Sequence, residues 1–424
     1  MENEGKQTSQ SNQIQQNNQS NQNEQNNQEK TFPNIFKPKN ASDYLNIFES
    51  FEEKKYRIMS LFANVGVAEA LLDGIADVKI ANEIDKKRAS FYKAVYPDTD
   101  MVCGDITDEN IQKQLIIKAK EEKVNLIIAT PPCQGMSLAG RREKHDVRNL
   151  LICHAISIIQ AVKPDYVLLE NVPEQLKTKI INENGEEQYI PDYIIEKLSG
   201  LYHINYRVVN MADYGVPQAR RRAVFLITRK DKPHWDFPKT GKWVTLKEAI
   251  GDLPELVPLI SDMDYDEFLK VFGDYEEKKK AGKACSKWHR PPIQKQRHVY
   301  IMEHTPTGKS AFDNEDKYKP RKADGSLIKG FRTCYKRQDW DRPAYTVTMS
   351  NGSISSQNNG HPGREKNGLY SDPRVLSILE LFRVMTIPDD WNVPEGYSDN
   401  FIRQVIGEGI PPLFLRKMIE NIRK

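Results

Sequence analysis

The residue best suited to take part in a reaction is Cys133, which follows two prolines at the end of an apolar run. Residues 124–128 have the length and composition of a buried parallel strand. Pro131 and Pro132 end that strand, because proline lacks the N–H donor that a sheet ladder needs. An isolated cysteine is more often a buried apolar residue than a reactive one. At the end of a strand in an open α/β sheet, however, a thiol lies where ligands bind, so Cys133 is a candidate nucleophile.

Acidic residues end three other predicted strands. Glu83 ends the second strand, Asp105 the third and Glu170 the fifth, while a turn at Gly66 follows the first. The carboxyl ends of parallel strands meet at one edge of a sheet, so we expect these residues to line one site. A carboxylate in the place of Glu83 commonly accepts ribose hydroxyls, although it could instead be solvated or cap the following helix. The single glycine turn, without a full G-x-G-x-x-G, identifies no particular nucleotide.

The elements that must position these residues begin at Tyr56, where strands start to alternate with helices. We expect strands over 57–62, 78–83, 102–106, 124–128, 165–170, 203–209 and 222–228. We expect helices over 67–73, 86–95, 110–122, 150–162 and 192–201. This alternation predicts a largely parallel sheet with helices on both faces. A helical period returns over 375–385, and a final helix over 413–423 could return to pack on this first domain.

Composition narrows the class of protein. The 424 residues carry a net charge of only +3, so attraction to nucleic acid must come from local clustering. No N-terminal apolar segment resembles a signal peptide, and no run of about 18 apolar residues could span a bilayer, so we expect a soluble cytoplasmic protein. The five scattered cysteines fit a reducing compartment. Residues 1–29 contain 17 Asn or Gln, and we expect a disordered tail over 1–40.

A second, loop-rich unit is expected after residue 230. Between residues 281 and 337 there are 14 Lys or Arg against 5 Asp or Glu. The aromatic residues interleaved with this charge are Trp288, His289, Tyr300, Phe331 and Tyr335. Such a composition is typical of a surface that tracks phosphates and stacks on bases, although charge clusters are more often only solvated surface. A zinc site could be assembled from Cys285, His289, His298, His304 and Cys334, but their spacing matches no standard pattern, and we predict no metal.

Four short motifs occur in a fixed order along the chain. They are Pro-Pro-Cys-Gln at 131–134, Glu-Asn-Val at 170–172, Gln-Ala-Arg-Arg-Arg at 218–222 and Arg-Pro-Ala-Tyr-Thr-Val-Thr at 342–348. In order and spacing they resemble the motifs of the DNA cytosine-5 methyltransferase family, of the bacterial or phage restriction-modification type. One such motif would be weak support, whereas four collinear ones are strong. The resemblance runs from about residue 56 to the C-terminus, apart from the loop-rich insert.

This resemblance implies a mechanism, because cytosine C5 is a poor nucleophile until a thiolate adds at C6. Cys133 would supply that thiolate, and Glu170 would assist at N3 if its surroundings keep it protonated. Arg222 would donate to O2, with Arg220 helping to hold the loop. The target base would be flipped out of the duplex, and the basic loop 135–149 would close over it. Taken singly, Glu170 could instead pair with a basic residue, and the arginines could be a solvated strand start.

The resemblance also implies that S-adenosyl-L-methionine is the methyl donor. The residues expected to bind it are Phe62, Gly66, Glu83, Ile84, Asp105, Ile106, Pro132, Leu151, Glu408 and Gly409. Among these, Phe62, Ile84, Asp105 and Ile106 would meet the adenine, and Glu83 the ribose hydroxyls. The sequence departs from the family pattern at three positions of this pocket. Ser60 stands where Asp is usual, Asn64 where Gly is usual, and Glu408 where Asn is usual.

The implied fold is an α/β, Rossmann-like methyltransferase with a mostly parallel sheet and a smaller target-recognition domain. We expect the catalytic domain over 50–234 and 372–424, and the recognition domain over 235–371. The partner would be double-stranded DNA, bound by a monomer, with a possible cognate restriction endonuclease acting separately. A tRNA cytosine-5 methyltransferase is an alternative that the large insert disfavours. A catalytically silent DNA-binding homologue is another, disfavoured by the intact Cys133, Glu170 and Arg222. The recognised DNA sequence depends on a few loop side chains and is not readable here.

Overall fold

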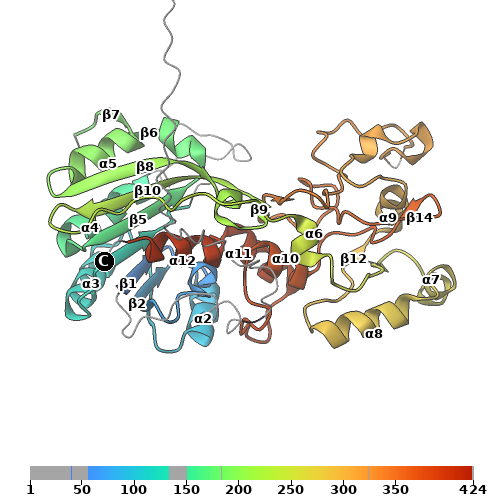
Figure 1. Cartoon of the computed structure of the whole chain (residues 1–424), viewed down its shortest axis with the longest axis horizontal. Coiled ribbons are helices and arrows are strands. Elements are labelled where there is room, and N and C mark those ends of the chain that lie inside the picture. Colours follow the sequence, from blue (N-terminus) through green and yellow to red (C-terminus); the bar gives the residue numbers. More distant parts are fainter. Residues whose placement is uncertain (1–39, 41–55, 133–149, 183, 323, 423–424) are drawn as a thin grey trace, which may run out of the picture. The chain divides into compact units, whose positions relative to one another are not determined.

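A seven-stranded sheet carries the predicted site (Figure 1). The computed structural model describes residues 40, 56–132, 150–182, 184–322 and 324–422, all within one unit of the chain, Ile35–Lys424. The strand order is β3-β2-β1-β4-β5-β10-β8. The strands are β1 (Tyr56–Leu61), β2 (Ala76–Glu83), β3 (Asp100–Cys103), β4 (Leu126–Ala129), β5 (Tyr166–Asn171), β8 (Tyr202–Asn210) and β10 (Arg221–Arg229). Strands β1 to β5 pair in parallel, and β10 pairs antiparallel with both β5 and β8, so β10 is the one reversed strand of this sheet. This confirms the mostly parallel α/β fold.

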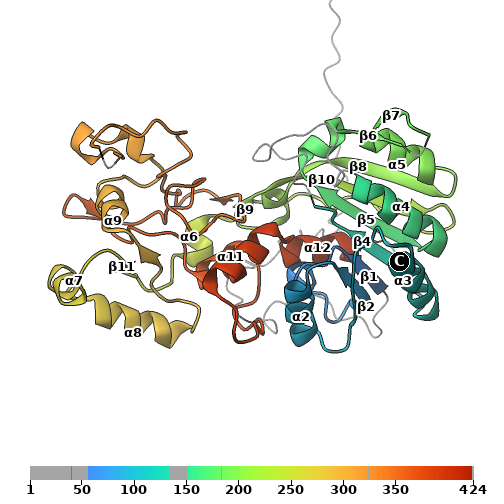
Figure 2. The same ribbon diagram turned by 180° about the vertical axis from the view of Figure 1, so that it is seen from behind.

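Helices cover both faces of this sheet (Figures 1 and 2). Adjacent residues of a strand point to opposite faces, so Met59 and Ile127 belong to one core cluster and Ile58 and Ile128 to another. The first cluster includes residues of α3 (Glu109–Glu121), α4 (Leu151–Val162) and α5 (Ile190–Leu198). The second includes residues of α12 (Pro412–Glu420). Burial on both faces explains why these strands are continuous apolar runs in the sequence.

Helix α2 (Lys86–Val95) has the predicted bounds, but the helix expected over 67–73 does not form. Only a 3-10 turn, η1 (Val67–Glu69), is present. The chain must turn into β2 almost at once, and the Leu72 carbonyl accepts hydrogen bonds from the next residues that make this turn, Ile75 and Ala76. Residues 66–72 are thus joined by successive three-residue turns, such as Ala70 N to Val67 O and Leu72 N to Glu69 O, instead of α-helical hydrogen bonds.

The third strand also ends earlier than expected, at Cys103. Asp105 lies in the turn that follows, and its Oδ1 accepts a hydrogen bond from Thr107 N at 2.9 Å. An Asp that bonds the backbone two residues ahead favours a turn over a strand. Asp105 and Ile106 are therefore presented by a loop beyond the sheet edge.

Of the C-terminal helices α10 (Ile378–Val384), α11 (Asp399–Glu408) and α12, the last packs on the seven-stranded sheet. Arg416 Nη1 donates to Leu71 O at 2.7 Å and to Asp73 O at 2.9 Å. Trp235 Nε1 donates to Met418 O at 2.8 Å. The prediction that the last helix packs on the first domain is confirmed.

Short elements and long connections make up residues 235–371. They are α6 (Leu246–Ile250), β11 (Leu259–Ile260), α7 (Tyr265–Val271), α8 (Tyr275–Cys285), β12 (Ile293–Gln294), α9 (Gln296–Glu303), η5 (Ala311–Asp313), η6 (Asp316–Tyr318), β13 (Ala344–Tyr345), β14 (Glu365–Lys366) and β15 (Leu369–Tyr370). The remaining elements of the chain are η3 (Pro173–Lys177), β6 (Lys179–Ile181), β7 (Glu187–Tyr189), η4 (Met211–Tyr214) and β9 (Gln218–Ala219). The expected loop-rich character of the insert agrees with these short elements.

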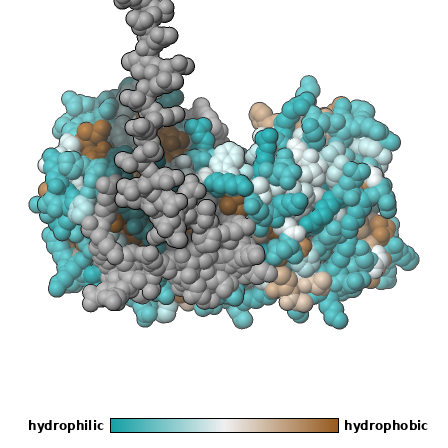
Figure 3. Space-filling view, viewed as in Figure 1, coloured by the Kyte–Doolittle hydropathy of each residue, from teal (hydrophilic) through white to brown (hydrophobic). Residues whose placement is uncertain are grey.

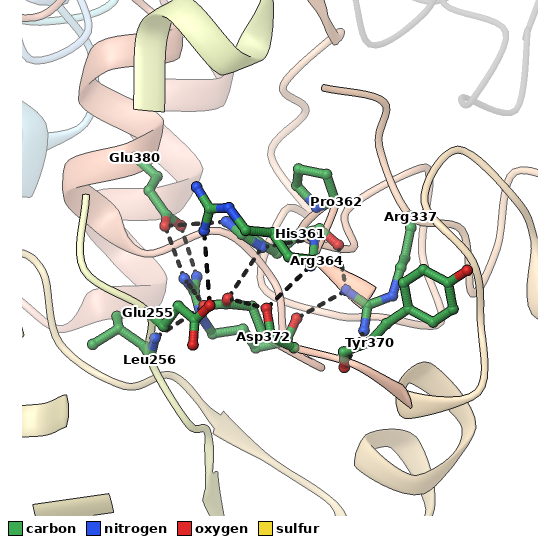
Figure 4. A network of polar contacts seen from close by, with 12 residues as sticks. Glu255, Leu256, Arg337, His361, Pro362, Arg364, Tyr370, Asp372 and Glu380 are labelled. Carbon is green, nitrogen blue, oxygen red and sulfur yellow. Dashed lines mark hydrogen bonds and ion pairs between the residues drawn. The ribbon is translucent and has the colours of Figure 1, made fainter. Parts of the chain in front are cut away.

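A buried charge network joins the insert to α10 (Figure 4). Arg374 Nη1 donates to Glu380 Oε2 at 2.7 Å, and Arg374 Nη2 donates to Asp372 Oδ1 at 2.6 Å. Arg337 Nη1 donates to the His361 carbonyl at 2.8 Å. All of these charged side chains are buried. Because unpaired buried charges are costly, this network constrains how the insert is attached.

The surface coloured in Figure 3 is mainly hydrophilic, and its apolar areas are small and separate. Within the part of the chain that the structure describes, no helix has the length and apolar character needed to cross a membrane.

Candidate active site

The chain that leads from β4 to Cys133 is anchored by a hydrogen bond from the neighbouring strand β5. All four residues of β4 are buried, and the chain then continues through Pro131. Asn171, the last residue of β5, donates from Nδ2 to Pro131 O at 3.0 Å. Residues 133–149, which include Cys133 and the predicted basic loop, lie outside the described residues. The hydrogen bond from Asn171 therefore anchors Pro131, which lies two residues before the candidate nucleophile.

Glu170 and Arg222 lie side by side at the end of β5. The antiparallel register places Val224 of β10 opposite Glu170, and Arg222 is two residues further along on the same face. Arg222 Nε is 2.9 Å from Glu170 Oε1, and the two side chains are 14% and 9% exposed. The alternative that Glu170 pairs with a basic residue is thus realised, and the basic residue is the predicted Arg222 itself. The structure brings these two candidates together beside the strand end that precedes Cys133.

Arg220 points into the protein instead. Its side chain is buried, and it donates from Nη1 to Val347 O at 2.9 Å and from Nη2 to Gly407 O at 3.1 Å. Its neighbour Gln218 accepts from Val347 N at 3.0 Å through Oε1. Strand β9 also pairs with β13, which opens the Thr-Val-Thr motif at 346–348. Arg220 therefore holds the strand start, a late motif and α11 together, in line with its expected loop-holding role.

Glu83 presents a buried carboxylate at the end of β2. Its Oε1 accepts from Asp85 N at 2.9 Å and its Oε2 from Asn64 N at 3.0 Å. Burial raises the pKa of Glu83, while the backbone donors and nearby Arg88 act in the opposite direction. The alternative that Glu83 caps α2 is wrong, because Asp85 is the capping residue. Next to Glu83, the side chain of Ile84 is 62% exposed, which leaves an apolar surface beside the carboxylate.

The turn after β1 combines three residues with left-handed backbone conformations. Phe62 has φ 60°, Asn64 has φ 51° and Gly66 has φ 78°. Asn tolerates this region better than most residues, which explains how Asn64 replaces a glycine here. A Cβ on Gly66 would lie 2.3 Å from the Tyr96 ring, so that position requires glycine. Asn64 Nδ2 donates to Val405 O at 3.0 Å, and its Oδ1 is buried with no hydrogen-bond donor among the described residues.

The other predicted pocket residues differ in exposure. Asp105 is exposed, whereas Ile106 is buried in the core beside the sheet. Pro132 and Leu151 are half-buried and lie at the two ends of the segment that is not described. Ile106 can therefore contribute to a ligand pocket only by packing behind its surface, whereas the exposed Asp105 carboxylate is available for a polar contact with a ligand.

The end of α11 approaches the same turn. Glu408 Oε2 is 2.8 Å from Arg88 Nη2. A Cβ on Gly409 would lie 2.8 Å from Val67, so the chain passes too close to η1 for any other residue. The sequence did not predict the ion pair of Arg88 with Glu408 or the hydrogen bond from Asn171 to Pro131. Asn171 could have been suspected from its place in the Glu-Asn-Val motif, but no sequence signal links Arg88 to Glu408.

The prediction that five aromatic residues of the insert line one exposed surface is wrong for three of them. Trp288, His289 and Tyr335 are buried, and only Tyr300 and Phe331, at 49% and 83% exposure, reach the surface. Trp288 packs in a core that includes α10 and α11, and Tyr335 packs in a small core of the insert, whereas His289 is buried through hydrogen bonds to Ser377 and Pro254. Stacking on bases by this insert would therefore rest on fewer aromatic residues than expected.

The alternative zinc site is not assembled in the structure. His289 engages Ser377 Oγ through Nδ1 at 3.0 Å and Pro254 O through Nε2 at 2.9 Å. His304 stacks on Tyr318, with ring centroids 3.6 Å apart. Outside residues 1–39, 41–55, 133–149, 183, 323 and 423–424, the chain contains no group of three or more His, Cys, Asp or Glu side chains that could hold a metal ion.

Comparison with known proteins gives a consistent result. The family model for C-5 cytosine-specific DNA methylase matches residues 56–424. The chain is 40% identical over 373 residues to the type II methyltransferase M1.HgaI of Avibacterium volantium, covering 86% of this chain and 96% of that one. It is 32% identical over 391 residues to the type II methyltransferase M.NgoPII of Neisseria gonorrhoeae, covering 87% and 95%.

Solved structures agree in fold. A prophage-encoded E. coli protein assigned as a DNA modification methyltransferase aligns with a TM-score of 0.56 at 21% identity, over 87% of this chain and 98% of that one. A DNMT2 variant from Spodoptera frugiperda aligns with a TM-score of 0.52 at 16% identity, over 87% and 99%. At such identities the likeness concerns the fold alone.

Proposed function

This chain belongs to the C-5 cytosine-specific DNA methylase family, and from that premise we propose how its residues perform DNA cytosine-5 methylation. The observation that carries the proposal is the Arg222–Glu170 pair, with Nε and Oε1 2.9 Å apart at the end of β5. The same strand ends in Asn171, which anchors the chain before Cys133. The end of β5 thus contacts both Arg222 of β10 and the chain two residues before Cys133.

In the proposed reaction the Cys133 thiolate adds to C6 of a flipped cytosine. Electron density moves toward N3, which Glu170 protonates, and C5 becomes nucleophilic enough to take a methyl group. Arg222, held by Glu170, donates to O2 and stabilises the charge that develops there. A base, which can be water, then takes the C5 proton, and the C6–S bond breaks to release the Cys133 thiolate. N3 returns its proton to the Glu170 carboxylate, which leaves neutral 5-methylcytosine. Arg220 acts only as a positioning residue, because its guanidinium is engaged elsewhere.

The residues around the first turn fit S-adenosyl-L-methionine, which when bound supplies an electrophilic methyl group. Glu83 offers carboxylate oxygens for a ribose diol, and the exposed Ile84 offers an apolar surface for an adenine ring. The buried Asn64 Oδ1 is an acceptor without a donor among the described residues, as expected beside a polar ligand. Phe62, Asp105, Pro132, Leu151 and the Glu408–Gly409 end of α11 would complete the pocket.

The substrate is DNA, and we propose that it is double-stranded and bound between two domains of a monomer. Residues 50–234 and 372–424 would carry the chemistry, and residues 235–371 would read the sequence. The excess of Lys and Arg in the insert supports this division, because phosphate contacts supply most of the affinity for DNA. A separate cognate endonuclease and action on cytoplasmic DNA would follow from the restriction-modification names of the relatives.

The test is transfer of tritiated methyl groups to duplex DNA and to tRNA by the purified full chain. We expect incorporation into DNA alone, followed by bisulfite sequencing that maps every modified cytosine to one short sequence. Transfer to tRNA instead of DNA, or modification with no common sequence, would contradict the proposal. An enzyme that binds cofactor and DNA yet transfers no methyl group would identify a catalytically silent homologue.

A further inference from the structure

Two contacts tie α11 to the Glu83 side of the site. Arg88 Nη2 and Glu408 Oε2 are 2.8 Å apart, with side chains that are 21% and 23% exposed. One turn earlier in α11, Val405 O accepts a hydrogen bond from Asn64 Nδ2 at 3.0 Å. A C-terminal helix is thus fixed to both elements that flank Glu83, the turn after β1 and the start of α2.

Arg88 acts on two carboxylates at once. It is ion-paired with Glu408, and its charge also acts on Glu83. Each oxygen of Glu83 accepts one backbone N–H, from Asn64 or from Asp85, and so retains a lone pair for another donor. Glu83 is thus a second carboxylate on which the charge of Arg88 acts when Glu408 no longer holds its guanidinium. The guanidinium would then compete for the lone pairs that Glu83 keeps for a ligand.

We propose that Arg88 and Glu408 are positioning residues for the ribose of the methyl donor. Glu408 engages the guanidinium of Arg88 and keeps it off Glu83, so that both Glu83 oxygens remain open to the ribose diol. Arg88 in turn keeps the end of α11 against the pocket. This inference rests on the proposed binding of S-adenosyl-L-methionine at Glu83.

The expected effects follow from this arrangement. In Glu408→Gln, Arg88 is released toward Glu83, and affinity for S-adenosylhomocysteine falls about tenfold, the loss of one hydrogen bond to a charged group. In Arg88→Met the same affinity falls because the end of α11 loses its ion pair to α2 beside the pocket. Arg88→Lys keeps a charge at this position and retains most of the affinity. The double variant Arg88→Met/Glu408→Gln binds better than the sum of the two single losses predicts, because no cation is left to compete.

The experiment is isothermal titration of the full chain with S-adenosylhomocysteine and with its 2′,3′-dideoxy analogue. Asp399→Asn is the matched control. Asp399 is the first residue of α11, at the opposite end from Glu408, and its exposed ion pair is with Arg290 of the insert. Thermal melting of every variant separates loss of binding from loss of fold.

We expect Glu408→Gln to weaken binding of the natural ligand and not of the dideoxy analogue, while Asp399→Asn weakens neither. Equal weakening of both ligands, or Glu408→Gln binding within about twofold of wild type, would overturn the inference. If the wild-type chain bound no S-adenosylhomocysteine, the proposed cofactor would itself be wrong and the inference would fall with it. A variant that melts early and loses both ligands counts against a positioning role.

Discussion

Replacing Arg374 by Met tests how much the buried charge network of Figure 4 stabilises the fold. Arg374 is fully buried and donates to Glu380 at 2.7 and 2.8 Å and to Asp372 at 2.6 Å. The variant leaves two carboxylates, each about 1% exposed, without the cation that both share. Removing one partner of a buried pair costs about 3–5 kcal/mol, a large part of the roughly 5–15 kcal/mol that holds a domain folded.

The expected pH dependence follows from the same contacts. Burial opposes ionisation of Glu380, but Arg374 and His361 lower its pKa to about 2, below its ordinary value of 4.5. In the wild type, the stability from this depressed pKa is therefore present above pH 4.5 and is lost as the pH falls toward 2. Without Arg374 the buried carboxyls protonate more readily, so the penalty of the variant is smaller near pH 5 than near pH 7.

Urea unfolding at both pH values measures these effects. Lys113→Met serves as the control, because the pair that Lys113 makes with Glu109 is exposed and is worth about 0.5 kcal/mol or less. A loss below about 1 kcal/mol in Arg374→Met, or a penalty that grows on acidification, would refute the reasoning.

Three further changes probe the site and its supports. Arg222→Met removes the O2 donor, and methyl transfer should slow by about 10²–10³-fold in single-turnover assays; an unchanged rate contradicts its role. Asn171→Ala frees the Pro131 carbonyl, so transfer should slow by up to about 10²-fold at saturating DNA, whereas an unchanged rate means the anchor is not needed. Gly407→Ala places a Cβ 2.2 Å from Thr348 O, so it should lose about 1–3 kcal/mol in thermal melting instead of gaining helix stability.

The sheet could be predicted because its signals are local. Buried parallel strands are continuous apolar runs, and the capping residue Asp85 marks the start of α2. The run before Cys133 and the polar residue that ends β5 were recognisable for the same reason. The bounds of η1 and β3 were missed because they depend on how soon the chain must turn, which periodicity does not report.

The contacts that complete the site could not be predicted, because they join distant parts of the chain. Nothing near Arg88 in the sequence identifies Glu408 as its partner. The orientation of Arg220 toward Val347 likewise depends on the pairing of β9 with β13. Trp288 was assigned to the surface from its basic neighbours, but packing against Phe382 of α10 buries it.

Covalent capture of the target base tests most directly whether Cys133 is the nucleophile. A duplex in which 5-fluorocytosine replaces the methylated cytosine cannot lose its C5 substituent as a proton, so the thiol remains attached after methyl transfer. The wild-type chain should form an adduct that survives denaturing electrophoresis and maps by mass spectrometry to the peptide containing Cys133, and Cys133→Ser should form none. A Cys133→Ser chain that still forms the adduct, or that methylates DNA at the wild-type rate, would contradict the mechanism.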